Sequence, residues 1–304
     1  MADMALPDGL VAFGPNANCT LNQSPLEWSL LRYKPSIPAN VFFLAAFGLC
    51  LAIHIVQGFW LKTWGFLISM ACGCIMEIVG YIGRILLYDN PFGFPGFLMQ
   101  IICITIAPVF YCAAIYVVIA QTIVYLDASI SRFQPRLLYQ VFIPCDIISL
   151  ILQAIGGALS VVADSKNDIH RGEQISLAGL IFQVVALGCF TIIFVEYLYC
   201  FYRSTSNSIL LAKSRLFLGF LLLAVLFILI RCVYRIIELK EGYFSEIFRD
   251  EPLFIALESC LMLASAFCLN IGHPGLFFPQ YREIKGESTQ YPLVPVKIKT
   301  HTGK

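Results

Sequence analysis

Two stretches of strongly apolar sequence contain charged side chains at helical spacing. The first stretch holds Glu77, Tyr81 and Arg84, and the second holds Arg231, Tyr234, Arg235 and Glu238. Spacings of three, four and seven residues place each set along one face of a helix. A charge at the centre of a bilayer costs about 2.5–3.5 kcal/mol on insertion, so intramembrane charges are normally paired or functional.

The two charged faces are complementary in sign. Both stretches are expected to cross the membrane in the same direction, and at about 1.5 Å per residue their charges fall at matching depths. We therefore expect two ion pairs, Glu77 with Arg231 and Arg84 with Glu238. Glu258, in the last apolar stretch, falls at the depth of Arg231 and would complete a three-helix network. Such pairs either fix helix register or line a binding site, and both interpretations remain open.

Further polar side chains favour a binding site. Gln153 and Gln183 lie in two other apolar stretches, and Asp146 lies deeper toward the cytosol. Together with the charges they predict a hydrated cavity that opens to the outer leaflet or the exterior. The candidate ligand-binding residues are Glu77, Tyr81, Arg84, Asp146, Gln153, Gln183, Arg231, Tyr234, Arg235, Glu238 and Glu258.

The elements that must position these residues are transmembrane helices. Hydrophobic residues make up 59% of the 304-residue chain and charged residues 13%, whereas soluble domains are about 45–50% apolar and about 25% charged. A membrane-spanning helix needs about 20 predominantly apolar residues. Seven stretches qualify: 39–61, 64–87, 97–124, 139–163, 176–202, 216–238 and 252–272. The predicted fold is an all-α integral membrane bundle of seven transmembrane helices.

Basic residues and sequons predict the orientation. With the N-terminus outside, the cytosolic segments hold more Lys and Arg residues than the outer ones, as the positive-inside rule requires. Two glycosylation sequons, at Asn18 and Asn22, precede the first helix. We therefore expect an extracellular arm (1–38), a helical domain (39–272) and a cytosolic tail (273–304).

Several function classes are not expected. A net charge of +1 offers no basic surface for nucleic acid. His54 and His273 are too few and too isolated for an intramembrane zinc site. Neither a serine-hydrolase motif nor a phosphate-binding loop is recognisable. We expect no enzymatic activity, no metal, no cofactor and no direct use of ATP, and the oligomeric state is left open.

The polar motifs follow one another in a distinctive order. They are Glu77-x-x-Gly80-Tyr81-x-x-Arg84, Ala107-Pro108-x-Phe110, Asp146 with Gln153-x-x-Gly156-Gly157, Gly179-x-x-x-Gln183, Arg231-x-x-Tyr234-Arg235-x-x-Glu238-x-x-Glu241-Gly242, Glu251 and His273-Pro274-Gly275. This series resembles the fungal lipid-translocating exporter family, which includes sphingoid long-chain base and aminocholesterol resistance proteins. The likeness covers nearly all seven stretches. It departs in the last one, where Ile255 and Glu258 stand in place of an aromatic residue and Asp.

The resemblance implies a multi-pass protein of the plasma membrane, with an endomembrane location as the alternative. Its members export or flop amphipathic lipids, such as sphingoid bases, and confer resistance to lipid-like toxins. Its partners would be membrane lipids and an amphipathic substrate, whose cationic amine an acid such as Glu77 or Glu258 would hold. The alternative function is a seven-helix lipid sensor that regulates membrane lipid asymmetry or stress signalling.

Overall fold

Every regular element in the described part of this computed structural model is helical. The structure describes residues 10, 14, 17–21, 24–29, 31–126, 132, 134–162, 166–204, 208–241 and 249–277. Seven of its helices are long and apolar enough to cross a membrane, which confirms the predicted helical bundle. Asn22 and residues 278–304, to which a sequon and most of the tail were assigned, lie outside the described residues.

The helices run somewhat further than the apolar stretches that predicted them. Their bounds are α1 Ile37–Leu61, α2 Trp64–Asp89, α3 Phe94–Leu126, α4 Pro135–Val162, α5 Lys166–Ser204 and α6 Ser208–Glu241. The last span is composite, with α7 Glu251–Phe254, the π-helix η4 Ile255–Cys260 and α8 Leu261–Ile271. Two short helices flank the bundle, η2 Leu26–Trp28 and α9 Pro274–Phe277.

The largest difference from the prediction lies at the start of α5. The polar run up to Gln174 was expected to be a loop, but the helix already begins at Lys166. Polar residues continue a helix beyond the hydrocarbon when neighbouring turns support each other. Here Arg171 Nη1 lies 3.2 Å from Asp168 Oδ1, and the Gln174 amide lies 3.1 Å from His170 Nε2. The hydropathy of the sequence predicted only the apolar part of α5, because the residues before 176 are polar although they are helical.

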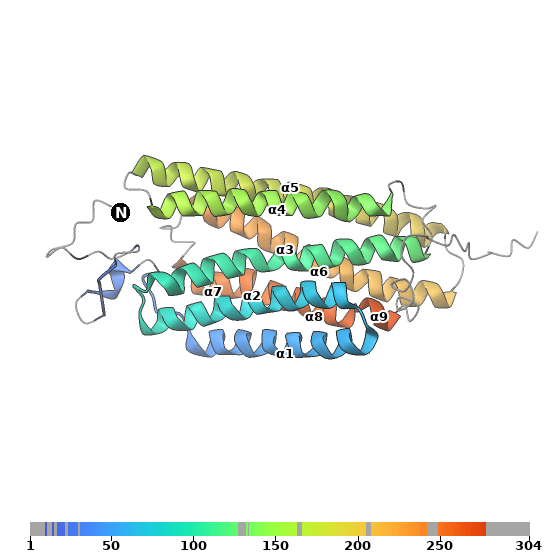
Figure 1. The fold of residues 1–304 in the computed structure, drawn as a ribbon, viewed down its shortest axis with the longest axis horizontal. Helices are drawn as coiled ribbons and strands as arrows, with labels where there is room; N and C mark the ends of the chain where they lie inside the picture. The colour runs from blue at the N-terminus through green and yellow to red at the C-terminus, as the bar shows by residue number, and fades with distance from the viewer. Residues whose placement is uncertain are drawn as a thin grey trace, which may run out of the picture.

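The spans form a ring in which consecutive helices touch. α1 contacts α2, and the order continues through α6 to α8, which returns to contact α1; α3 also reaches α6 across the ring. Figure 1 shows α4 and α5 side by side along one long edge and α1 along the opposite edge. We call the two ends of the bundle the Glu251 end, where α1 and α7 begin, and the Lys62 end, where α1 turns into α2.

A tight turn makes α1 and α2 an antiparallel hairpin. Lys62 adopts the left-handed conformation with φ 55° and ψ 36°, and its amide donates to the Gly58 carbonyl. Gly58 is required here because a Cβ would lie 2.7 Å from Leu67 Cβ. The hairpin therefore places the inward faces of α1 and α2 next to each other along the whole bilayer.

Candidate functional site

The predicted charges of α6 and the last span meet in the interior. Arg231 Nε donates to Glu258 Oε1 at 2.7 Å, and its Nη2 contacts the same oxygen. Nη2 also donates to the Ile104 carbonyl of α3 at 2.8 Å. Arg231 and Glu258 are both buried. The π-helix η4 carries Glu258, and such wide turns often occur at functional positions.

A second group of contacts surrounds Arg84 nearer the Glu251 end. Its Nε donates to Asn40 Oδ1 at 2.9 Å and its Nη2 lies 3.1 Å from Glu251 Oε1. The guanidinium also stacks 4.1 Å from the centre of the Phe254 ring. The same carboxylate accepts from the Ser36 amide at 2.7 Å. Arg84 therefore links α1, α2 and α7.

The segment before α1 also reaches Arg84. Arg84 Nη2 lies 3.4 Å from the Tyr33 hydroxyl oxygen. Burial raises the pKa of the Tyr33 phenol above its ordinary value, and the neighbouring Arg84 charge opposes that rise. The phenol is therefore neutral at physiological pH and its oxygen accepts from the guanidinium.

The third ion pair lies within α6. Arg235 Nη1 contacts Glu238 Oε2 at 2.5 Å, one turn along the same helix, and Arg235 Nη2 lies 3.4 Å from Thr105 Oγ1 of α3. Glu238 and Tyr234 are both buried. We define the charge network as Glu77, Arg84, Arg231, Arg235, Glu238, Glu251 and Glu258.

The expected pairings within the network were wrong, although Glu258 does lie at the depth of Arg231 as expected. Arg231 pairs with Glu258, Arg84 pairs with Glu251, and Glu238 pairs with Arg235. Depth alone suggested the other combinations. The rotation of each helix decided which groups meet, and periodicity does not give that rotation.

Glu77 is left without the partner that was expected for it. The residue has no exposed surface, and neither carboxyl oxygen has a hydrogen-bond partner among the described residues. The charges of Arg231 and Glu258 act on it from α6 and η4. A buried acid beside a closed ion pair is costly if ionised, so this position requires either a proton or a cation.

The other predicted polar residues form separate contacts on the α4 side of the bundle. Asp146 Oδ2 accepts from the Tyr116 hydroxyl of α3 at 3.0 Å. The Gln153 amide donates to Gln183 Oε1 at 3.0 Å, which joins α4 to α5. The first contact joins α3 to α4 and the second joins α4 to α5. Neither contact includes a residue of the charge network.

The predicted cavity open to the exterior stays a prediction. Glu77, Tyr81, Arg84, Arg231 and Glu258 are all buried, whereas the side chains of Arg235 and Glu251 are 14% and 17% exposed. A pocket of about 270 Å³ lies at the Lys62 end, between the α1–α2 turn and α3, lined by residues that include Lys62, Trp64 and Gln121.

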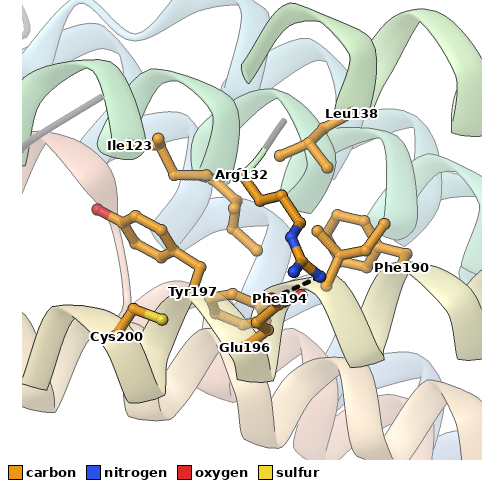
Figure 2. A pocket seen from close by; sticks show the side chains of 10 residues that line it. Ile123, Arg132, Leu138, Phe190, Phe194, Glu196, Tyr197 and Cys200 are labelled. Carbon is orange, nitrogen blue, oxygen red and sulfur yellow. Dashed lines mark ion pairs between the residues drawn. The ribbon is translucent and has the colours of Figure 1, made fainter. Parts of the chain in front are cut away.

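A smaller hollow lies between α3, α4 and α5. Figure 2 shows its aromatic wall, with Phe190, Phe194 and Tyr197 on α5, and the Arg132–Glu196 ion pair beside it. That pair measures 3.2 Å, and both side chains are exposed. None of the network residues lines either pocket.

Sequence reasoning did not include Asn40, Tyr33 and Glu251 among the site residues. Asn40 is a single polar residue near a helix start, where such residues are common, so it gave no signal. Glu251 did give one, because it precedes Glu258 by seven residues and therefore shares its helix face. The exposed Asn18 sequon stays a prediction.

Comparison with known proteins agrees with the motif order. Residues 70–281 match the family described as RTA1 like protein. The chain belongs to this family. The family assignment confirms the resemblance drawn from the motifs.

Relatives within the RTA1-like family come from Saccharomyces cerevisiae. The sphingoid long-chain base transporter RSB1 is 31% identical, over 95% of this chain and 82% of its own length. Protein RTM1 is 26% identical over 83% of this chain and 93% of its own length. Protoporphyrin uptake protein 1 is 30% identical over 66% of each chain. No solved structure matches. The homology supports a role of this multi-pass membrane protein in lipid or membrane transport.

Proposed function

We propose that this protein moves amphipathic lipids with a cationic amine, above all sphingoid long-chain bases, across the plasma membrane and thereby confers resistance to them. The observation that carries the proposal is the unpaired, buried carboxyl of Glu77. Within the spanning helices, the network holds four carboxyl groups but only three guanidinium groups. The position beside Glu77 therefore lacks one positive charge.

A sphingoid base supplies what this position lacks. Its ammonium group is a compact cation with several hydrogen-bond donors, which suits a carboxylate with two free oxygens. Its long apolar tail lies favourably among helices whose outer faces are apolar. Since Glu77 is closed off here, binding requires the helices around it to part, and the Arg231–Glu258 pair is the nearest contact that such a movement would break.

The test is lipid movement in liposomes that contain the purified full chain. Fluorescent NBD-sphingosine in the inner leaflet is protected from dithionite, and its loss of protection measures movement. We expect Glu77→Gln to slow this movement at least tenfold, because the amide keeps the size and removes the charge. Glu196→Gln is the matched control, since Glu196 is an exposed acid of α5, and it should move lipid like the wild type.

A second lipid separates amine recognition from unspecific movement. NBD-ceramide has a similar apolar body without the ammonium group, so the protein should move it far more slowly. Equal rates for the two lipids, or full activity of Glu77→Gln, would show that Glu77 does not recognise the amine.

One observation favours a lipid sensor as the second candidate. Tyr33 and Ser36, before α1, contact Arg84 and Glu251 directly. A lipid that displaced these contacts would transmit its presence from the segment before α1 to α2 and α7. Binding of NBD-sphingosine to the purified protein without any movement between leaflets would support this function over transport.

A further inference from the structure

A second polar cluster lies at the Lys62 end, and the binding of a lipid amine does not use it. His54 of α1 is fully buried, and neither ring nitrogen makes a hydrogen bond of normal geometry among the described residues, although the Ala266 backbone lies near the ring. Asn270 of α8 is also buried, with both side-chain polar atoms unpartnered. Buried polar groups are normally satisfied, so several unpaired ones in one place need an explanation.

The contacts around these groups bring three helical segments together. The side-chain amide of Gln57 in α1 donates to the backbone carbonyl of Asn270 at 3.2 Å. His273 Nε2 lies 3.3 Å from Thr63 Oγ1, and His273 Nδ1 accepts from the Gly275 amide at 3.2 Å. The neutral His273 ring therefore carries its proton on Nε2, toward Thr63.

The two histidines are close neighbours although they are 219 positions apart in the chain. The Phe66 ring contacts both edge-on, with centroid distances of 5.8 Å to His54 and 5.0 Å to His273. The two imidazole rings are close enough to interact electrostatically. The sequence had suggested that these residues are isolated, and the ring closure between α1 and α8 brings them together.

Polar side chains continue from this cluster toward Glu77. The Cys50 thiol lies beside the Asn270 amide, and Cys74 interacts with both Cys50 and Glu77. Cys74 also accepts from the Tyr111 hydroxyl at 3.5 Å. Cys50, Cys74 and Tyr111 are buried, so this connection runs inside the bundle.

Beyond Glu77 the polar groups continue to the Glu251 end. Tyr81 of α2 lies near Glu77, Glu258 and Arg84, and Glu258 keeps one unpartnered oxygen. Arg84 holds Glu251 in place at this end through their ion pair, and its guanidinium does not itself take up or release a proton. Ionisable groups thus line the interface of α1, α2 and the last span from one end of the bundle to the other.

We propose that this line of side chains, from His273 and His54 through Glu77 to Glu251, is a proton path across the membrane that drives lipid movement by proton exchange. The coupling rests on the proposed function, whereas the path itself does not. Chains of acidic and histidine side chains inside membrane bundles are typical of proton relays. Unpaired nitrogens and oxygens provide the sites between which a proton passes.

The exchange of a proton for an ammonium group keeps the charge at Glu77 balanced. An empty site holds Glu77 as the neutral acid, because an isolated carboxylate is costly in hydrocarbon. When an ammonium group arrives, the Glu77 proton leaves along the path and the carboxylate binds the amine. When the lipid departs, a proton from the other side returns to Glu77. One proton is exchanged for one ammonium group, so the bound site never carries net excess charge.

The groups around Glu77 determine whether its carboxyl holds a proton or an ammonium group. Arg231 and Glu258 act from α6 and η4, and Tyr111 and Cys103 face it from α3. Because Arg231 is already paired with Glu258, its charge is not available to hold Glu77 as a permanent carboxylate. The proton or the amine must do so.

The experiment measures protons and lipid in the same liposomes. The full chain is reconstituted with the pH-sensitive dye pyranine inside, and an acidic outside buffer drives protons inward, while valinomycin with equal potassium on both sides holds the membrane potential at zero. NBD-sphingosine movement is followed in parallel. We expect His54→Leu and Glu77→Gln each to reduce proton flux at least tenfold. His170→Leu and Glu196→Gln are the matched controls, because His170 is exposed on α5 and the Glu196 side chain on the same helix is 41% exposed.

His54→Leu also tests whether this histidine is only a packing residue. The change removes two unpaired buried nitrogens, so the melting temperature should not fall below that of the wild type. A stable His54→Leu protein that conducts protons like the wild type would overturn the path. A stable protein that has lost proton flux would support it.

The remaining outcomes separate this inference from the proposed function. If the wild type moves NBD-sphingosine but an imposed pH gradient leaves the rate unchanged, the coupling is wrong and the lipid function stands. If it conducts protons without moving lipid, the path stands and the lipid function fails. If it does neither, both are wrong.

Discussion

At the scale of single residues, the energetics depend on how each buried charge is neutralised. Arg231 donates from Nε to the Glu258 carboxylate and from Nη2 to the Ile104 carbonyl. Arg84 likewise combines Asn40, Glu251 and the Phe254 ring. Glu77 has no such partner. The network is therefore well satisfied except at Glu77, to which we assign the substrate, and at one carboxyl oxygen of Glu258.

The Arg231–Glu258 pair should show the asymmetry of buried ion pairs. Arg231→Met leaves Glu258 as an uncompensated buried acid and should destabilise the protein by about 3–5 kcal/mol. The double variant Arg231→Met with Glu258→Met removes both charges and should recover most of that loss. Thermal unfolding in detergent measures both.

The control for this pair is Arg132→Met, which breaks the exposed pair with Glu196. Exposed pairs contribute about 0–1 kcal/mol, so its melting temperature should stay near that of the wild type. A double variant as unstable as Arg231→Met would show that the two residues do not stabilise each other.

At the scale of helices, small residues decide how closely the spans approach. Gly156 of α4 faces α5 so tightly that an added Cβ would lie 2.4 Å from the Ser176 nitrogen. Its neighbour Gly157 has nothing within 4 Å of such a Cβ. Of this glycine pair, only Gly156 therefore lies in a close helix contact.

Gly156→Ala should force α4 and α5 apart. Overpacking of this kind costs about 1–3 kcal/mol, and thermal unfolding should show it as a lower melting temperature. Gly157→Ala is the matched control and should be neutral or slightly stabilising, since alanine favours helix more than glycine does. Equal destabilisation by both would contradict the close contact.

The same scale explains which parts of the fold were predictable. Apolar length gave all seven spans, and helical spacing placed Glu77 with Arg84 and Arg231 with Glu238 on common faces. The pairing failed because it depends on helix rotation and on the π-helix at Ile255–Cys260, whose wider turn changes the direction of the residues around Glu258. The sequence contains no pattern that predicts this π-helix.

At the scale of the whole molecule, the ring brings distant parts of the chain to one interface. The hairpin of α1 and α2 packs on the last span, so the His54 cluster and the network members on α2 and the last span share the same three-helix boundary. A movement that opens one part of this boundary acts on the other. This arrangement suits an exchange in which the proton and the lipid occupy Glu77 in turn.

The orientation of the ring has a direct test in cells. With the N-terminus outside, Asn18→Gln and Asn22→Gln should each remove one glycan, seen as faster migration on gels that matches enzymatic deglycosylation. An epitope at the C-terminus should react with antibody only after permeabilisation. Labelling of that epitope on intact cells would reverse the orientation.

Ring closure also governs how the protein is made. Arg84 and its acidic partner Glu251 are separated by 167 residues, so at ribosome speeds of about 5–20 residues per second the arginine waits roughly 8 to 33 s for that partner. During this interval α2 carries an acid and a base without their final neighbours. We therefore expect substitutions that leave more unpaired charge on α2 to lower the yield of inserted protein more than they lower the melting temperature of the folded protein.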